Sequence, residues 1–484
     1  MTDPVLRRLA LGTILPAFPG TVAPSWATRL LREGLAGYTL FGYNIADQAQ
    51  LATLVAQLRD ARPDCLLALD EEGGDVTRLS YHEGSPYPGN AALGAADDPE
   101  LTWATYQGIG LDLASVGINV NYAPTVDVNT ADENPVIGTR SFGADPALVA
   151  RHTAAAVAGL QSAGVAGCAK HFPGHGATVA DSHLELPTIA DSLSVVRSRD
   201  LPPFEAAIAA GIRMIMTAHI RVPELTGDAP ATASSRVLVD LLRDELGFKG
   251  AVVTDALEMR GASGAIGQPE AAVRALLAGA DLLCLGAEID EALVEGVTAG
   301  IIEAVESGRL PAARLEEAVA RGVAAGAGLV PLRSEKPEFV REAIRTAARL
   351  AVRVEGSLPQ LREPLLVQLG SEANIAVGTV PWGLPLDGEL VTVPMGAEAY
   401  TGPSADDLAA AAGDRDIVVV GRDTHRWPHA KALIEALAAR HPGVVLVEMG
   451  WPSSWRPAGI SAFVSTYGAS RANGFAAVEA LRGA

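Results

Sequence analysis

Short apolar runs alternate with longer amphipathic segments along the first two-thirds of the chain. Eight of these runs have the length and the β-branched or apolar character of buried strands. The segments between them carry apolar residues at helical spacing, for example over 47–60, 144–163 and 269–279. The expected strands are 10–15, 36–41, 65–70, 117–123, 165–170, 212–217, 250–255 and 280–285.

Strands that alternate with helices predict a parallel sheet with right-handed crossovers. Eight such units in a little over 300 residues indicate a (β/α)8 TIM-type barrel. A doubly wound sheet is the alternative, but no GxGxxG turn follows the first expected strand. The pattern therefore favours the barrel.

A second α/β unit follows the barrel. Two prolines and three charges lie close together at 331–337, and one amphipathic helix is expected over 338–353. From 357 the alternation resumes, with strands at 365–370, 416–421, 443–450 and 462–468, and helices at 430–441 and 472–482. We therefore predict a barrel domain over 1–333, a linker with a helix over 334–356, and a smaller α/β sandwich domain over 357–484.

Composition and charge narrow the function classes. The chain has 37 basic and 57 acidic residues, a formal net charge of −20. Such a surface repels phosphate backbones, so we expect no nucleic-acid partner. No apolar run approaches membrane-span length, and the N-terminus lacks a signal-peptide pattern. We expect a cytoplasmic protein without a membrane partner, in which Cys65, Cys168 and Cys284 are small buried hydrophobes. The sequence does not indicate an oligomeric state.

Polar residues follow five of the eight expected barrel strands. Asp70 ends the third strand, Lys170 and His171 end the fifth, and Asp255 ends the seventh. In barrels of this type the reactive groups gather at the carboxyl ends of the strands. Aspartates there also cap helices, so each residue taken alone has a structural alternative; together they predict a catalytic mouth.

The stretch from Lys170 to Gly176, KHFPGHG, followed by Asp181-Ser182-His183, resembles the signature of family 3 glycoside hydrolases, and more narrowly of the NagZ-type β-N-acetylglucosaminidases. Supporting segments are DEEGG at 70–74 with Arg78, NPVIGTRSF at 134–142, and VVTDALEM at 252–259. They occur in the family's order over about residues 5–330. A weaker likeness to two-domain members continues at YGAS, 467–470.

The resemblance implies that Asp255 is the nucleophile of a retaining mechanism. An ionised carboxylate can stabilise an oxocarbenium-like transition state and then form a covalent glycosyl-enzyme intermediate. The structural alternative is a helix cap, because Asp255-x-x-Glu258 has capping-box spacing.

The resemblance also assigns the acid/base role to His183, paired with Asp181, on a mobile loop. A carboxylate at one ring nitrogen fixes the tautomer and raises the basicity of the imidazole. The small residues of GATVA, 176–180, suit a loop that opens and closes. A plain surface turn is the alternative for Asp-Ser-His.

By the same resemblance, the sugar subsite consists of Asp70, Arg78, Arg140, Lys170 and His171. Ion pairing within the strand ends is the alternative role for the cations. The roles of His175 and His219 stay open between support and substrate contact. A rival class is a metal-dependent barrel that uses the histidines as ligands. Phe-Pro-Gly between His171 and His175 excludes a helix there, so we expect no metal and no cofactor.

Two questions stay open within the family. The acceptor is water or inorganic phosphate, since a histidine acid/base does not repel a phosphate dianion as a glutamate would. The expected substrate is a small saccharide with a terminal β-linked N-acetylglucosamine, from muropeptide or chitin fragments. In the second domain, GRDTHRWPH at 421–429 follows a strand end and either closes over the barrel mouth or packs as ordinary surface.

Overall fold

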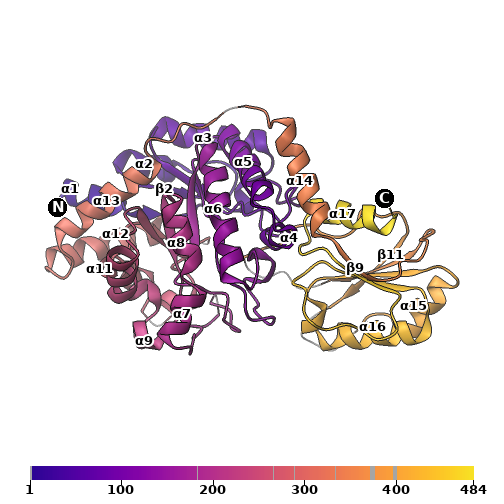
Figure 1. Ribbon diagram of the computed structural model, residues 1–484. Coiled ribbons are helices and arrows are strands. Elements are labelled where there is room, and N and C mark those ends of the chain that lie inside the picture. Colours follow the sequence, from indigo (N-terminus) through magenta and orange to yellow (C-terminus); the bar gives the residue numbers. More distant parts are fainter. Residues whose placement is uncertain are drawn as a thin grey trace.

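The computed structural model describes residues 3–182, 184–264, 266–287, 289–332, 334–370, 376–395 and 401–483. A barrel in indigo to magenta lies beside a smaller orange and yellow domain (Figure 1). Six parallel strands form one sheet in the order β2-β3-β4-β5-β6-β7. The barrel strands are β1 (Ile14–Leu15), β2 (Gly37–Thr39), β3 (Leu66–Leu69), β4 (Val120–Asn121), β5 (Ala166–Phe172), β6 (Met214–Thr217), β7 (Ala251–Thr254) and β8 (Leu283–Cys284).

The ring closes through β1 and β8. These two strands pair in parallel, and a bridge from Val253 to Leu282 joins β7 to the start of β8. On the other side, the backbone N–H of Thr39 donates to the carbonyl of Pro16, which ties β2 to β1. Each of the eight expected strands overlaps an observed one, which begins one to four residues after the expected start, and residues 10–11 belong to a helix. The predicted barrel is confirmed.

Helices cover the outside of the barrel. The sequence determines where two of these helices, α5 (Pro99–Ser115) and α6 (Pro146–Ser162), begin. Asp98 and Asp145 are their N-cap residues and accept hydrogen bonds from the first-turn backbone amides, and a proline follows each cap. The barrel-domain helices of seven residues or more are α1 (Pro4–Leu11), α2 (Ser25–Glu33), α3 (Gln48–Ala61), α4 (Asn90–Ala96), α5 (Pro99–Ser115), α6 (Pro146–Ser162), α7 (Leu193–Arg199), α8 (Pro202–Ala209), the π-helix η4 (Arg236–Glu245), α11 (Gln268–Ala278), α12 (Glu291–Glu306) and α13 (Ala312–Gly326).

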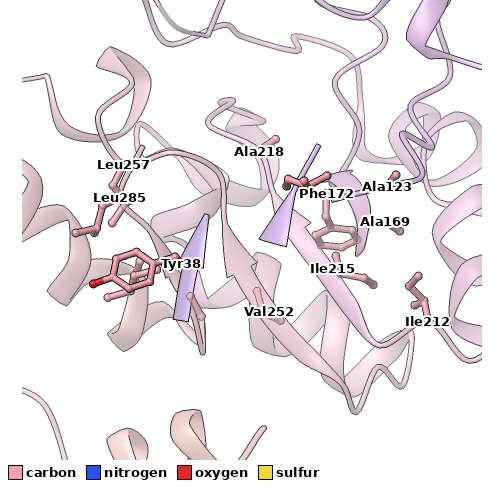
Figure 2. Close-up of a cluster of buried hydrophobic side chains, with 14 of the residues drawn as sticks. Tyr38, Ala123, Ala169, Phe172, Ile212, Ile215, Ala218, Val252, Leu257 and Leu285 are labelled. Atoms are coloured by element: carbon pink, nitrogen blue, oxygen red, sulfur yellow. The ribbon is translucent and has the colours of Figure 1, made fainter. Parts of the chain in front are cut away.

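Successive strand residues supply two layers of core. One set, including Ala169, Ile215 and Val252, faces the helices; the other, including Cys168, Met216 and Cys284, fills the barrel interior. Figure 2 shows part of the outer layer, where the rings of Tyr38 and Phe172 lie among aliphatic side chains. Because β3, β6 and β7 are buried on both faces, their sequences are nearly continuous apolar runs rather than alternating ones.

The second domain is a six-stranded sheet with helices on both faces. Its order is β11-β10-β12-β13-β14-β9, parallel except for the antiparallel edge strand β9. The strands are β9 (Arg353–Gly356), β10 (Leu365–Gly370), β11 (Glu389–Pro394), β12 (Ile417–Gly421), β13 (Val444–Glu448) and β14 (Ala462–Ser465). The helices are α14 (Glu338–Ala351), which leads into the sheet, α15 (Ala405–Ala412), α16 (Pro428–Arg440) and α17 (Arg471–Leu481).

The predicted smaller α/β domain is confirmed as a fold class, and the exact domain boundaries stay a prediction. Strand β9 lies inside the segment expected to be a linker and pairs with β14, so that segment contributes to the sheet. The three cysteines are free and buried, as expected. Within the described ranges, the chain has no helix of the length and hydropathy that a membrane crossing requires.

Candidate active site

A blind cavity of about 160 Å³ opens at the carboxyl ends of the barrel strands. Its floor is formed by the interior side chains Tyr122, Met216 and Cys284. A larger cleft of about 430 Å³ lies at the opposite end of the barrel and contains none of the candidate residues. Six of the eight predicted site residues line the cavity: Asp70, Arg78, Arg140, Lys170, His171 and Asp255.

Two buried cations share one buried carboxylate. Lys170 donates to Asp70 Oδ1 over 2.6 Å and lies 2.7 Å from Glu72 Oε1. Arg140 donates to both Glu72 oxygens, over 2.8 and 3.0 Å. Burial alone would raise the pKa of Glu72, but Arg140 and Lys170 more than offset it and hold that pKa well below its usual range. Glu72 therefore stays ionised and allows both cations to be buried.

His171 is oriented by a second buried carboxylate. Its Nδ1–H donates to Asp127 Oδ2 over 2.7 Å, and Arg140 Nη2 approaches its Nε2 at 3.4 Å. Asp127 Oδ1 also accepts from the backbone amides of His171 and His175. Burial works against the charge on Asp127, yet His171 and His175 together lower its pKa. The contact fixes the tautomer, so that His171 presents Nε2 to the cavity.

Arg78 reaches the cavity from the loop after β3. Its Nη2 donates to the carbonyl of Ala376, in the second domain, over 2.9 Å and lies 3.8 Å from Asp70 Oδ2. Its Nε is buried and makes no hydrogen bond within the described residues. Glu71 fixes the backbone of this loop, because its Oε2 accepts a hydrogen bond from the backbone amide of Arg78 over 2.8 Å. Burial raises the pKa of Glu71 to about 7.

Asp255 follows β7 directly and lines the cavity. Its Oδ1 accepts from the backbone amide of Ala256 over 2.8 Å. The helix-cap alternative is wrong, because the next short helix begins at Arg260 and its cap residue is Met259. His219 supports this turn from below: its Nε2 donates to the carbonyl of Ala256 over 3.0 Å. His219 is fully buried and takes no part in the cavity wall.

The loop after β5 carries the predicted acid/base pair. His183 lies outside the described residues, so its pairing with Asp181 stays a prediction. Asp181 itself is partly buried. His175 closes the start of this loop: its Nδ1 is hydrogen-bonded to Thr178 Oγ1 at 2.8 Å and its Nε2 to Ser182 Oγ at 3.0 Å. Burial lowers the pKa of His175 to about 4, so the ring is neutral at pH 7.

The metal-dependent alternative required the histidines to converge. The rings of His171 and His175 lie edge to face with centroids 6.0 Å apart, and each is held by the partners described above. Across the described ranges, no group of three or more His, Cys, Asp or Glu side chains has the arrangement of a metal site.

Comparison with known proteins places this site in a family. The model of the Glycosyl hydrolase family 3 N terminal domain matches residues 20–324. The chain belongs to glycosyl hydrolase family 3. It is 35% identical over 326 residues to β-hexosaminidase A of Pseudoalteromonas piscicida, covering 62% of this chain and 54% of that protein. It is 36% identical over 311 residues to a β-hexosaminidase of Stenotrophomonas maltophilia strain K279a, covering 62% and 89%.

A solved family 3 structure extends the likeness to both domains. The family 3 β-N-acetylglucosaminidase from Paenibacillus sp. str. FPU-7 superposes with a TM-score of 0.88 at 33% identity, covering 99% of this chain and 96% of that one. The resemblance to NagZ-type family 3 enzymes is thereby confirmed, and with it the classification as a glycoside hydrolase.

Sequence reasoning missed two residues that organise the family 3 site and left the role of a third, His175, open. Glu72 and Asp127 are the buried counterions of Lys170, Arg140 and His171, and His175 anchors the loop after β5. Glu72 lies two residues after Asp70, within the DEEGG segment that supports the family resemblance. Three cations assigned to one site imply counterions, and this was the signal available for Glu72 and Asp127.

Proposed function

We propose that the protein is an exo-acting, retaining β-N-acetylglucosaminidase that removes terminal β-linked N-acetylglucosamine from small saccharides. The observation that carries the proposal is Asp255 facing a blind cavity whose wall also holds Arg78, Arg140 and Lys170. A cavity closed at its floor admits the end of a saccharide rather than its middle. Relatives that are named β-hexosaminidase and β-N-acetylglucosaminidase support the choice of sugar.

The reaction runs in two steps. Asp255 attacks the anomeric carbon while His183 donates its proton to the glycosidic oxygen, and the bond to the leaving group breaks. His183 then removes a proton from water, the water oxygen bonds to the same carbon, and the bond to Asp255 breaks. Two inversions give net retention. Asp181 holds the imidazole of His183 in the tautomer that both steps require.

The sugar is held by Asp70, Arg78, Arg140, Lys170 and His171. Carboxylate acceptors and cationic donors fix the ring through paired hydrogen bonds with its hydroxyls. The Nε2 of His171 is a polar atom for such contacts. Lys170 and Arg140 are already held by Glu72. They therefore lose little side-chain conformational entropy when they bind the sugar.

The choice between water and phosphate as the acceptor is made at the glycosyl-enzyme stage. The described lining residues include four carboxylates, Asp70, Glu72, Asp255 and Glu258, and three cations. In the glycosyl-enzyme Asp255 is esterified and uncharged, so an entering phosphate dianion meets three carboxylates and three cations, and this balance does not exclude it. Relatives named β-hexosaminidase favour water as the acceptor. Phosphorolysis is therefore the second candidate.

Turnover of para-nitrophenyl β-N-acetylglucosaminide, with and without inorganic phosphate, tests the proposal. We expect free N-acetylglucosamine at a rate that does not depend on phosphate. Sugar 1-phosphate would make the protein a phosphorylase, and turnover of the β-glucoside alone would overturn the choice of sugar. Parallel assays on chitobiose and on a muropeptide fragment separate the two natural substrate classes. A cytoplasmic location stays a prediction from the sequence.

A further inference from the structure

The second domain meets the barrel with the carboxyl ends of its parallel strands. Segments that follow β10, β12, β13 and β14 all contact barrel loops, through Ala376, Arg422, Trp451 and Ala469 respectively. In an open α/β sheet this edge is the usual ligand-binding edge. Here it is occupied by the rim of the barrel.

Asp75 is the centre of this interface. Its side chain is 2% exposed. Oδ1 accepts from the backbone amide of Ala469 over 2.8 Å, and Oδ2 accepts from Arg422 Nη2 over 3.2 Å. Oδ2 also accepts from Thr139 Oγ1 over 2.7 Å. A single buried carboxylate thus joins the second domain to the barrel loop after β4 as well as to its own loop after β3.

Both barrel loops carry an arginine of the sugar subsite. Asp75 lies three residues before Arg78, and Thr139 directly precedes Arg140. A shift of either loop therefore moves a cation that lines the cavity.

Two further contacts hold the loops from the second domain. The Tyr81 hydroxyl is hydrogen-bonded to Thr379 Oγ1 at 3.2 Å and accepts from the Thr379 amide, beside an apolar cluster of Val76, Val377 and Val380. These contacts hold the segment that contains Ala376, whose carbonyl accepts a hydrogen bond from Arg78 Nη2.

On the other loop, Trp451 Nε1 donates to Asp132 Oδ1 over 3.1 Å, and His425 Nε2 donates to the Asp132 carbonyl over 3.1 Å. The loop that ends in Arg140 is thus held at its start by Asp132 and near its end by Thr139. GRDTHRWPH therefore docks on the barrel rim.

We propose that Asp75 is a positioning residue through which the second domain sets the places of Arg78 and Arg140, and so the affinity of the site for the terminal sugar. The inference rests on the proposed function for its choice of sugar. It assigns the second domain a role in sugar binding that works through these two barrel loops.

The test compares Asp75→Asn with Arg471→Ala. Asparagine has nearly the same shape but loses the ion pair with Arg422. The control removes another interdomain ion pair, from Arg471 to Glu83, whose side chains are 43% and 73% exposed. We expect Asp75→Asn to raise KM and the Kd for N-acetylglucosamine about tenfold, with a smaller change in kcat. Arg471→Ala should change neither.

A second measurement needs no substrate. Backbone hydrogen exchange in the folded Asp75→Asn protein should accelerate at 76–82 and 136–142, and not in the Arg471→Ala protein. Arg422→Ala should reproduce both effects, and the double variant should add little to them. Unchanged exchange in these segments, or an equal change in the control, would overturn the proposal even where turnover is lost.

The two proposals fail in different ways. If the wild-type protein neither binds nor hydrolyses the N-acetylglucosaminide, the proposed function falls, whereas faster exchange in both loops would still support the bracing role of Asp75. If the wild-type protein is active and Asp75→Asn keeps its sugar affinity, the positioning role is wrong and the function stands.

Discussion

The two sides of the cavity mouth are built from different interactions. On the side formed by the loops after β3 and β4, Glu72 pairs with Arg140 and with Lys170 of β5, and Asp75 ties both loops to the second domain. On the side formed by the loop after β5, a neutral His175 joins Thr178 to Ser182. Charge-assisted hydrogen bonds are roughly twice as strong as neutral ones.

This difference matches the two tasks of a glycosidase. The sugar must be held in one orientation, which favours a fixed, ion-paired and braced wall. The leaving group must depart and water must enter, which favours a side that opens. Val179 and Leu184 are 71% and 61% exposed on the loop after β5. The more weakly held side is therefore the side that carries the predicted acid/base.

His183→Ala should show the largest contrast between the two sides. We expect kcat/KM on chitobiose, a substrate with a poor leaving group, to fall about a hundredfold to ten-thousandfold. The para-nitrophenyl glycoside should lose far less, because its leaving group needs no proton. Steady-state kinetics on both substrates measure the effect. An equal loss on both would show that His183 is not the general acid.

Glu72→Ala removes the anchor of the ion-paired side. Lys170 and Arg140 would then lie buried without their shared counterion, and we expect the free energy of unfolding to fall by about 3–5 kcal/mol. Urea unfolding measures the change. As a matched control, Glu83→Ala removes an exposed carboxylate and should change stability by less than about 0.5 kcal/mol. An unchanged midpoint for Glu72→Ala would mean that this side is not held by charge.

His175→Gln should give a smaller, pH-dependent effect on the opposite side. The pKa of His175 is lowered from 6.5 to about 4 in the folded protein, so the unfolded chain binds the proton first as the pH falls. Its contribution to stability is therefore fully present above pH 6.5 and is lost as the pH falls towards 4, by up to about 3 kcal/mol. Glutamine does not titrate.

The stability difference between wild-type and His175→Gln protein should therefore narrow between pH 7.5 and pH 4.5, as measured by urea unfolding at each pH. A difference that stays constant over this range would contradict a buried, neutral His175.

The sequence predicts the barrel strands and the residues at the cavity mouth, but not the contacts that distinguish its two sides. Barrel strands such as β3 and β7 were predictable, because they are apolar on both faces. Strands β9 and β11 were missed because their side chains are mostly exposed and give no apolar pattern. The motif residues marked which side chains reach the mouth. They did not show that Glu72 forms ion pairs with two cations, or that Asp75 contacts Ala469, which lies 394 residues further along the chain.

The most direct test of the central claim is to trap the covalent intermediate. An N-acetylglucosaminyl donor with a good leaving group and a fluorine beside the ring oxygen should react and then hydrolyse slowly, because fluorine destabilises both transition states. Mass spectrometry of a protease digest should find one added sugar on Asp255. Asp255→Ala protein should remain unlabelled and keep less than about one per cent of the wild-type turnover. A label on another residue, or undiminished turnover by Asp255→Ala, would contradict the assignment of Asp255 as the nucleophile.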